Sequence, residues 1–230
     1  MMGRRKIYQR LKMSRKADTS QRPLLKQELL GASSVLDVGC GTTSPLRGTP
    51  KNFYTVGADI FKPSLLTLKT HKFYDDLVLA DGRHLPFKDE TFDVVLAFEV
   101  IEHMNKQEGY NFLIHMTRLA KKKVILSTPS GFKPQNEYAN VYARHLSGWN
   151  PAEFKAWGFR VMGFGGLKIF FYDSLCRLSQ RTANSPLHLL INLVIFTFAD
   201  ATCWLGCERM PEKSRQILCV KVFSESTNRT

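Results

Sequence analysis

Acidic side chains accompany four short apolar runs in the first half of the chain. Asp37 lies near the end of the first run, and Asp59, Asp81 and Glu99 follow the next three. A carboxylate at the tip of a second parallel strand, about 20 residues after a glycine turn, can accept hydrogen bonds from ribose hydroxyls. Asp59 has this spacing from the glycines that follow Asp37. The pattern therefore indicates a site for a nucleoside-containing ligand.

Two glycines, Gly39 and Gly41, follow the first run and allow the backbone to turn sharply and to approach a ligand. A dinucleotide site would have a third glycine near position 44, where this chain has Thr43 and Ser44. The carboxylate of Asp37 repels a diphosphate, whereas it attracts the ammonium group of a methionine moiety. The charge balance therefore favours S-adenosylmethionine as the ligand.

The runs that carry these residues are predicted to be strands of one parallel sheet. Strands are expected within residues 35–41 and at 53–59, 77–80 and 92–98, followed by 124–127, 160–161 and 216–223. Parallel strands bring their carboxyl ends to one edge of the sheet, where ligands of α/β folds bind. A helix start is expected at Ser44–Pro45, a short capped helix at 150–159, and a solvated loop at 121–123. The patterns predict an α/β, doubly wound fold.

Four motifs, in order over roughly residues 30–165, resemble those of class I S-adenosylmethionine-dependent methyltransferases. They are VLDVGCG at 35–41, GAD at 57–59, DGRHLPF at 81–87 and FDVVLAFEVIEH at 92–103. The likeness is strongest to the group that contains quinone and other small-molecule methyltransferases. It implies a Rossmann-like seven-stranded sheet and S-adenosylmethionine as the cofactor.

The resemblance also implies that the motif residues bind the cofactor. The expected contacts with its methionine end are Asp37, Gly39 and Gly41. Asp59 is expected to contact the ribose, and Asp81 with its neighbour Gly82 is expected to contact the adenine edge. Further contacts are expected from Cys40, Ile60, Phe98 and Glu99. Thr43 stands where the family often has a third glycine, a departure from the family pattern that leaves the path of this loop open but not the identity of the ligand.

Glu102 and His103 follow the fourth strand and are the expected catalytic residues. A histidine pKa near neutrality suits a general base, and the motif places His103 beside the expected sulfonium. Contact with the substrate is a further role for both residues. In a structural alternative, both side chains only cap and pin the loop beside the cofactor.

A metal site is another alternative for this region. Carboxylate and imidazole ligands from Glu99, Glu102, His103 and His145 suit a divalent ion. This set resembles the metal site of small-RNA 2′-O-methyltransferases, and the segments at 127–129 and 145–149 extend that likeness. Because Glu-x-x-Glu-His occurs in methyltransferases with many substrates, the motif does not identify the acceptor.

Length and composition suit one domain with appendages: 230 residues, of which 43% are hydrophobic and 23% charged. The methyltransferase domain is expected at 26–223, with a flexible basic arm at 1–25, an apolar helical insertion at 171–214 and a flexible tail at 224–230. The apolar part of 186–200 is shorter than the roughly 20 residues that cross a bilayer. A buried or substrate-covering helix is therefore expected there, with a helix lying on a membrane surface as the alternative.

Charge and cysteine usage bear on the location of the protein. The formal net charge is +13, and residues 1–26 hold nine Lys or Arg against Asp18 alone. Such a segment can contact anionic lipid or RNA, act as an organellar transit peptide, or remain a soluble arm. Five cysteines and no secretory signal indicate a reducing compartment, with Cys203 and Cys207 packed in the core or at an interface. The expected location is the cytoplasm, with membrane association open.

These observations predict a methyltransferase that uses S-adenosylmethionine and acts on a small or lipid-like acceptor. One alternative is metal-assisted methylation of RNA, and a further alternative is a cofactor-binding regulator without turnover. The sequence contains no Ser-His-Asp elbow, P-loop or paired-cysteine zinc motif, so it offers no competing chemistry. It does not indicate the oligomeric state.

Overall fold

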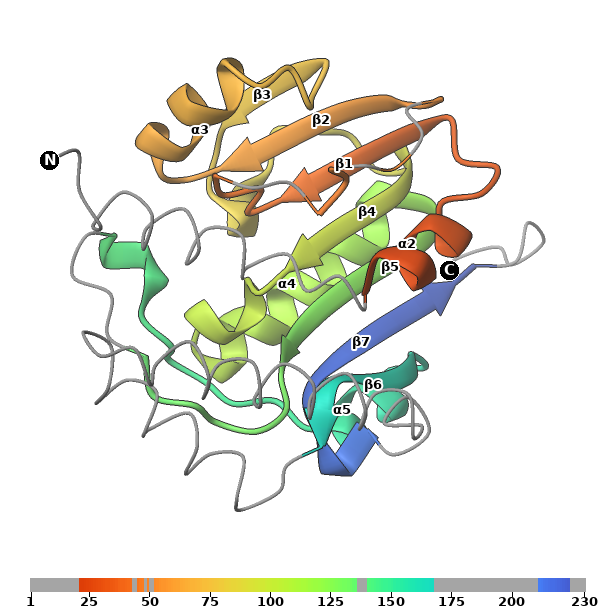
Figure 1. Cartoon of the computed structure of the whole chain (residues 1–230), viewed down its shortest axis with the longest axis vertical. Helices are drawn as coiled ribbons and strands as arrows, with labels where there is room; N and C mark the ends of the chain where they lie inside the picture. Colours follow the sequence, from red (N-terminus) through yellow and green to blue (C-terminus); the bar gives the residue numbers. More distant parts are fainter. Residues whose placement is uncertain are drawn as a thin grey trace, which may run out of the picture.

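The computed structural model describes residues 21–42, 45–47, 49, 52–135, 140–167 and 211–223. Within them, seven strands form one mixed sheet in the order β3-β2-β1-β4-β5-β7-β6 (Figure 1). Strands β1 to β5 run parallel, and β7 pairs antiparallel with both β5 and β6. The sheet confirms the predicted doubly wound α/β fold.

The strands are β1 (Ser34–Val38), β2 (Tyr54–Asp59), β3 (Asp76–Leu79), β4 (Phe92–Phe98), β5 (Ala120–Pro129), β6 (Arg160–Leu167) and β7 (Ser214–Val222). The α-helices are α2 (Gln21–Glu28), α3 (Lys62–Lys69), α4 (Lys106–Leu119) and α5 (Pro151–Ala156). Short 3-10 helices are η1 (Gly82–His84), η2 (Ile101–His103), η3 (Val141–Ala143) and η5 (Pro211–Lys213). Capping boxes begin α4 at Asn105 and α5 at Asn150. The second box confirms the capped helix predicted at 150–159.

Apolar side chains alternate between the two faces of the central strands and so build two cores. In β4, Val95 and Ala97 pack toward one face, with α4 and α5, whereas Val94 and Leu96 pack toward the other, with α2 and α3. The same alternation occurs in β1, β5 and β7. Because successive side chains of a strand point to opposite faces, a strand covered on both sides is apolar throughout. This explains why the sequence shows continuous apolar runs.

The three lysines at 121–123 are a correction to the sequence prediction. They are part of β5, which begins at Ala120, and do not form a solvated loop. Lys122 Nζ lies 3.0 Å from Asp93 in β4, and Lys123 Nζ lies 3.2 Å from Glu28 in α2. The long lysine side chains therefore reach carboxylates on neighbouring elements while their backbone stays in the sheet.

Other predictions lie at the edge of the described residues. Pro45 is in a turn and does not begin a helix, and Ser44 lies outside the described residues. Helix α2 begins at Gln21 and so overlaps the end of the predicted basic arm, and Leu25 in it is buried. The predicted insertion lies outside the described residues up to η5, as do Cys203, Cys207 and the tail. None of the described helices is long and apolar enough to cross a membrane.

Candidate active site

One cavity of about 680 Å³ opens at the carboxyl edge of the parallel strands. Every residue predicted to bind the cofactor lines it: Asp37, Gly39, Cys40, Gly41, Asp59, Ile60, Asp81, Gly82, Phe98 and Glu99. The predicted catalytic residues Glu102 and His103 line it as well, and so does His145. The strand register explains this convergence, because β1, β2 and β4 pair with their carboxyl ends level, Val38 lying beside both Ala58 and Ala97.

The glycine turn after β1 requires its two glycines. Gly39 and Gly41 have φ angles of 68° and 60°, in the left-handed region that other residues rarely adopt. A Cβ on Gly39 would also lie 2.4 Å from Val100 Cγ2. The amides of Gly39 and Cys40 both donate to the carbonyl of Ala58 in β2. The turn is thus folded back onto β2 beside the cavity.

Asp59 at the end of β2 holds this turn in place. Its Oδ2 accepts a hydrogen bond from the Gly41 amide at 2.8 Å, and its Oδ1 accepts one from the Phe61 amide at 2.7 Å. Burial raises the pKa of Asp59, and these two hydrogen bonds oppose that shift. The carboxylate therefore links the glycine turn to the start of α3 while it lines the cavity.

Asp37 is a buried carboxylate with one oxygen engaged. Tyr74 donates its hydroxyl hydrogen to Oδ2, whereas Oδ1 has no hydrogen-bond partner within the part of the chain that the structure describes. Burial raises the pKa of Asp37 to about 7; the Tyr74 hydrogen bond acts in the opposite direction, and nearby Asp59 adds to the rise. Cys40 beside it is buried, and burial raises the pKa of its thiol, so it is unreactive.

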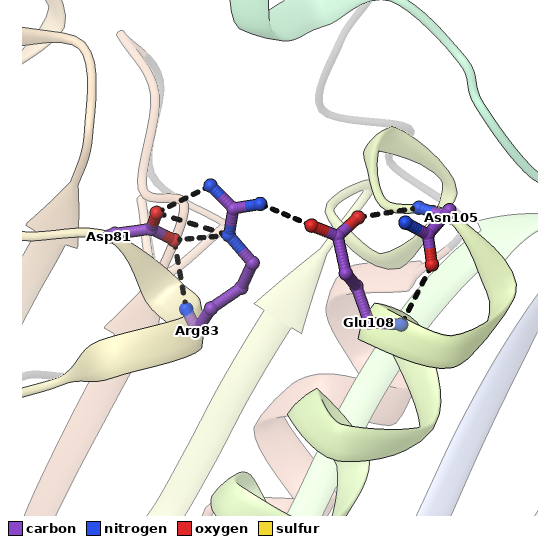
Figure 2. A network of polar contacts seen from close by, with 4 residues as sticks. All are labelled: Asp81, Arg83, Asn105 and Glu108. Carbon is purple, nitrogen blue, oxygen red and sulfur yellow. Dashed lines mark hydrogen bonds and ion pairs between the residues drawn. The ribbon is translucent and has the colours of Figure 1, made fainter.

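Asp81 begins η1 and is held by Arg83. Figure 2 shows the Arg83 guanidinium between the carboxylates of Asp81 and Glu108. Arg83 Nη2 lies 2.6 Å from Asp81 Oδ2, and this hydrogen-bonded pair lowers the pKa of Asp81. Glu108 in turn completes the capping box of α4 with Asn105 (Figure 2). The network ties η1 to the first turn of α4.

Glu99 is held away from the other proposed metal ligands. Its Oε1 accepts a hydrogen bond from Ser127 Oγ in β5, and its Oε2 accepts one from Gln216 Nε2 in β7, both at 2.9 Å. Glu99 also has a φ of 55°. The structure therefore brings Glu99 to the cavity wall, as predicted for a cofactor contact, but does not group it with Glu102, His103 and His145.

Glu102, His103 and His145 form a compact cluster. One potential ligand atom from each lies within 4.8 Å of the others, a grouping found by searching the described residues alone. Glu102 is buried, and its Oε2 accepts a hydrogen bond from Thr128 Oγ1 at 3.0 Å. Its backbone carbonyl accepts from the amides of Leu146 and Ser147. These bonds fix the loop that carries His145 against η2.

Both imidazole rings of the cluster are oriented by backbone carbonyls. His103 Nδ1 lies 3.1 Å from the carbonyl oxygen of Arg144, and His145 Nδ1 lies 2.6 Å from that of Lys133. A carbonyl oxygen can only accept, so we assign the ring hydrogen to Nδ1 in both residues. In this tautomer Nε2 carries the lone pair that can accept a proton or bind a metal.

The outer wall of the cavity is formed by residues 140–146. Val141, Tyr142 and Leu146 line the cavity and are 78%, 47% and 52% exposed. Arg144 adds one positive charge to this wall. A polar cluster thus lies next to exposed apolar side chains.

Comparison with known proteins agrees with this geometry. Residues 36–128 match the family described as methyltransferase domain. This segment is therefore similar to a methyltransferase domain, as the sequence motifs predicted. This methyltransferase domain has the fold of a SAM-dependent methyltransferase from Archaeoglobus fulgidus, with 18% identity, a TM-score of 0.52 and coverage of 88% of this chain and 94% of that one.

Two curated relatives share parts of the methyltransferase domain. An uncharacterized protein of Methanocaldococcus jannaschii, MJ0638, is 30% identical over 145 residues, which are 63% of this chain and 62% of the relative. The 18S rRNA (guanine-N(7))-methyltransferase bud23 of Schizosaccharomyces pombe is 36% identical over 89 residues, 37% of this chain and 33% of that protein. The chain thus covers less than two thirds of the length of both relatives.

The residues of the methyltransferase domain fit S-adenosylmethionine. The buried Oδ1 of Asp37, without a partner in the described residues, suits the cofactor ammonium, and the glycine turn lines the cavity beside it, as expected for the methionine end. Sequence reasoning missed Tyr74, Arg83 and Gln216, which hold Asp37, Asp81 and Glu99. Gly57 in β2 is the one signal for Tyr74, because a Cβ there would lie 3.1 Å from Tyr74 Cγ.

Proposed function

We propose that this chain is an enzyme that transfers a methyl group from S-adenosylmethionine to a nucleophile on a small, partly apolar acceptor. The observation that carries the proposal is the cavity in which the cofactor residues meet Glu102, His103 and His145. Its volume of about 680 Å³ falls in the usual range of ligand pockets, roughly 300–1,000 Å³. When bound, the cofactor supplies an activated methyl group, so the protein has mainly to align the acceptor.

Charge supports a small acceptor over a nucleic acid. Among the described residues that line the cavity, six are carboxylates and two are arginines, and Arg83 is already paired with Asp81 and Glu108. A phosphate backbone would bring more negative charge to this wall, which is unfavourable. The exposed Val141, Tyr142 and Leu146 instead offer apolar contact area. An uncharged or cationic acceptor with an apolar part suits both features.

Within this proposal, the nucleophilic group of the acceptor lies next to Glu102 and His103. His103 Nε2, with Nδ1–H directed at the Arg144 carbonyl, takes the proton of an attacking hydroxyl or amine. Glu102, buried and held by Thr128, favours the charged imidazolium that forms. Val141 and Tyr142 orient the apolar part of the acceptor.

The test is transfer of radiolabelled methyl from S-adenosylmethionine into a host extract, followed by separation into organic, small-polar, nucleic-acid and protein fractions. Label in the organic or small-polar fraction is expected. Label in RNA would instead support the RNA alternative. No label, despite measured cofactor binding, would support a regulator without turnover.

Two variants separate binding from turnover. Asp59→Ala is expected to abolish cofactor binding under every one of these functions, because the ribose contact and the support of Gly41 are both lost. His103→Ala is expected to keep cofactor binding and to lose turnover, which a regulator would not require. Unchanged affinity in Asp59→Ala would mean that the cofactor site is elsewhere.

A metal-dependent form of the reaction is the second candidate, favoured by the geometry of the cluster. Glu102, His103 and His145 would hold the ion, whereas Glu99, bonded to Ser127 and Gln216, would not. Metal-binding histidines commonly donate their other ring N–H to a carbonyl, as both do here. Such an ion would polarise an acceptor oxygen and lower the pKa of its hydroxyl.

Metal binding is measured independently of methyl transfer, by titrating the metal-free protein with Co²⁺ and following its absorption. His145→Ala is expected to lose the signal, whereas His71→Ala, which alters an exposed ring stacked on Phe73, keeps it. An absence of Co²⁺ binding, together with activity that survives a chelator, would leave His103 as the general base.

A further inference from the structure

Tyr74, a tyrosine outside the predicted motifs, is hydrogen-bonded to the carboxylate of Asp37, two residues before the glycine turn. Tyr74 lies between α3 and β3 and is 8% exposed. It donates its hydroxyl hydrogen to Oδ2 of Asp37, which lines the cavity in β1. The other oxygen, Oδ1, is buried without a hydrogen-bond partner in the described part of the chain. One oxygen is thus occupied by the protein and the other is left for a ligand.

The loop of Tyr74 is anchored so that its ring passes β2. Thr55 in β2 donates from its amide and its hydroxyl to Asp75 Oδ2, both at 2.8 Å, and accepts at its carbonyl from the Asp75 amide. Gly57, two residues later, leaves the space that the ring occupies, since a Cβ there would lie 3.1 Å from Tyr74 Cγ. Because β2 lies between β1 and β3 in the sheet, this gap lets the hydroxyl reach β1.

We propose that Tyr74 is a positioning residue for cofactor binding, which holds the Asp37 carboxylate by one oxygen and favours its ionised form, so that Oδ1 accepts the ammonium of S-adenosylmethionine. The proposal rests on the cofactor of the proposed function. An ammonium in this site needs a negative partner, because burying an unpaired charge is costly. A protonated Asp37 would be a much weaker partner.

The surroundings of Asp37 make its ionisation sensitive to this hydrogen bond. The ionisable groups that act on it are Tyr74 from the loop before β3 and Asp59 from β2, and the neighbouring Cys40 keeps a neutral thiol because its pKa is raised. Burial raises the pKa of Asp37 to about 7, Asp59 contributes to the rise, and the Tyr74 hydroxyl lowers it. Loss of the hydroxyl therefore moves the pKa further up, so Asp37 is largely protonated at neutral pH.

The test uses Tyr74→Phe, which keeps the ring and removes only the hydroxyl. Calorimetric titration with S-adenosylmethionine is performed over a pH range on both sides of neutrality. We expect affinity about tenfold weaker at neutral pH, with a difference that narrows as the pH rises. Tyr54→Phe is the matched control, because the Tyr54 hydroxyl bonds to exposed Asp76 and neither residue lines the cavity, and it is expected to match the wild type.

Combining Tyr74→Phe with Asp37→Asn tests whether the effect of the Tyr74 hydroxyl depends on the Asp37 carboxylate. In the Asp37→Asn protein, Tyr74→Phe is expected to change neither the affinity nor its pH dependence. A folded Tyr74→Phe protein with the wild-type pH profile, or with the same loss at every pH, would overturn the proposal.

A second measurement does not depend on the cofactor. Carbon NMR titration of the Asp37 carboxyl in the ligand-free protein is expected to show a higher pKa in Tyr74→Phe than in the wild type. An unchanged carboxyl pKa would overturn the role of Tyr74. If the carboxyl shifts but the wild type does not bind S-adenosylmethionine, the proposed function fails and the hydrogen bond between Tyr74 and Asp37 is still established.

Discussion

Asp59 serves two purposes at the carboxyl edge of the sheet. Its two oxygens accept hydrogen bonds from the amides of Gly41 and Phe61, at 2.8 and 2.7 Å. Those bonds leave lone pairs on both oxygens for ribose hydroxyls, because a carboxylate has about four acceptor sites. In the proposed function, Asp59 therefore couples the shape of the glycine turn to cofactor binding.

Replacement of Asp59 by Asn tests this coupling more finely than replacement by Ala. Asn keeps the shape of the side chain but turns an NH₂ group toward one of the two amide donors. We expect cofactor affinity to fall about 10- to 100-fold, as for loss of hydrogen bonds to a charged group. Asp89→Asn, at an exposed ion pair with Arg118, is the control. Calorimetry that gave equal affinities for the two variants would contradict the assignment.

Asp37 also makes stability depend on pH in the ligand-free protein. Its pKa is about 7 in the fold and 3.8 in the unfolded chain, so the folded state favours the protonated form. The stabilisation is fully present below about pH 4 and is lost as the pH rises through about 7. Asp37→Asn cannot ionise and escapes this loss. The free energy of unfolding of Asp37→Asn, relative to wild type, should therefore increase by a few kcal/mol between about pH 4 and about pH 8.

Urea unfolding at the two pH values measures this difference. Asp93→Asn serves as a control whose difference from wild type should be nearly the same at both pH values, because a lowered carboxyl pKa affects stability only below about pH 4. Hydrogen bonds from the Ser33 amide and Lys122, together with charge from Lys122 and Lys121, outweigh the burial that opposes them and lower the pKa of Asp93. A difference between Asp37→Asn and wild type that does not change with pH would show that Asp37 remains ionised throughout.

The carboxylates that line the cavity were predictable from local motifs, and the side chains that hold them were not. Asp37 and Asp59 can be found because each closes an apolar run at a fixed distance from the glycines. Tyr74 bonds to Asp37 across 37 positions of sequence, and Gln216 bonds to Glu99 across 117. Contacts of that separation depend on which strands become neighbours. Glu99 was assigned to the metal set for the same reason: its partners on β5 and β7 were unknown.

At the scale of elements, α4 packs unusually closely against the segment that carries His145. Gly109 in α4 faces Trp149, and a Cβ on Gly109 would lie 2.3 Å from Trp149 Cζ2. Trp149 donates from Nε1 to Ser147 Oγ, and the Ser147 amide donates to the carbonyl of Glu102. The contact between Gly109 and Trp149 is therefore linked, through Ser147, to Glu102 of the cluster.

Gly109→Ala is expected to destabilise the protein by about 1–3 kcal/mol through overpacking, despite the better helix propensity of alanine. It should also impair turnover more than cofactor binding, because displacement of Trp149 moves the loop of His145. Gln107→Ala, on the exposed face of the same helix, should change the free energy of unfolding by a few tenths of a kcal/mol. Thermal unfolding together with methyl-transfer assays checks both expectations. Equal stability of the two variants would contradict the packing argument.

For the whole molecule, apolar runs and glycine turns predicted the sheet, because strands buried on both faces are apolar throughout. The prediction of a loop at 121–123 was wrong, because the charge of the three lysines does not reveal that Lys122 and Lys123 pair with Asp93 and Glu28. The two faces of the sheet could be separated only with the structure. Each strand contributes alternate residues to each core, and nothing in a uniformly apolar run says which helix covers which face.

The strong positive charge of the chain suggests a role for its first residues. The formal net charge is +13, and residues 1–20 hold seven Lys or Arg against Asp18. We propose that this segment brings the enzyme to anionic lipid surfaces, where each basic residue contributes about 1 kcal/mol. The cavity described above carries excess acid, so the basic segment and the cavity would face different ligands.

A variant with these seven residues changed to Gln keeps the chain length and removes the charge. It should cosediment much less with phosphatidylserine-containing vesicles than the wild type, while S-adenosylmethionine affinity is unchanged because no cavity residue is altered. Vesicles of phosphatidylcholine alone should retain little of either protein, and added salt should weaken binding of the wild type, since a Debye length is about 10 Å at 0.1 M. Equal cosedimentation of both proteins with the anionic vesicles would exclude the segment as the lipid contact. Membrane association, if it occurs, would then depend on another part of the chain, and the apolar residues at 186–200 would be the next to replace.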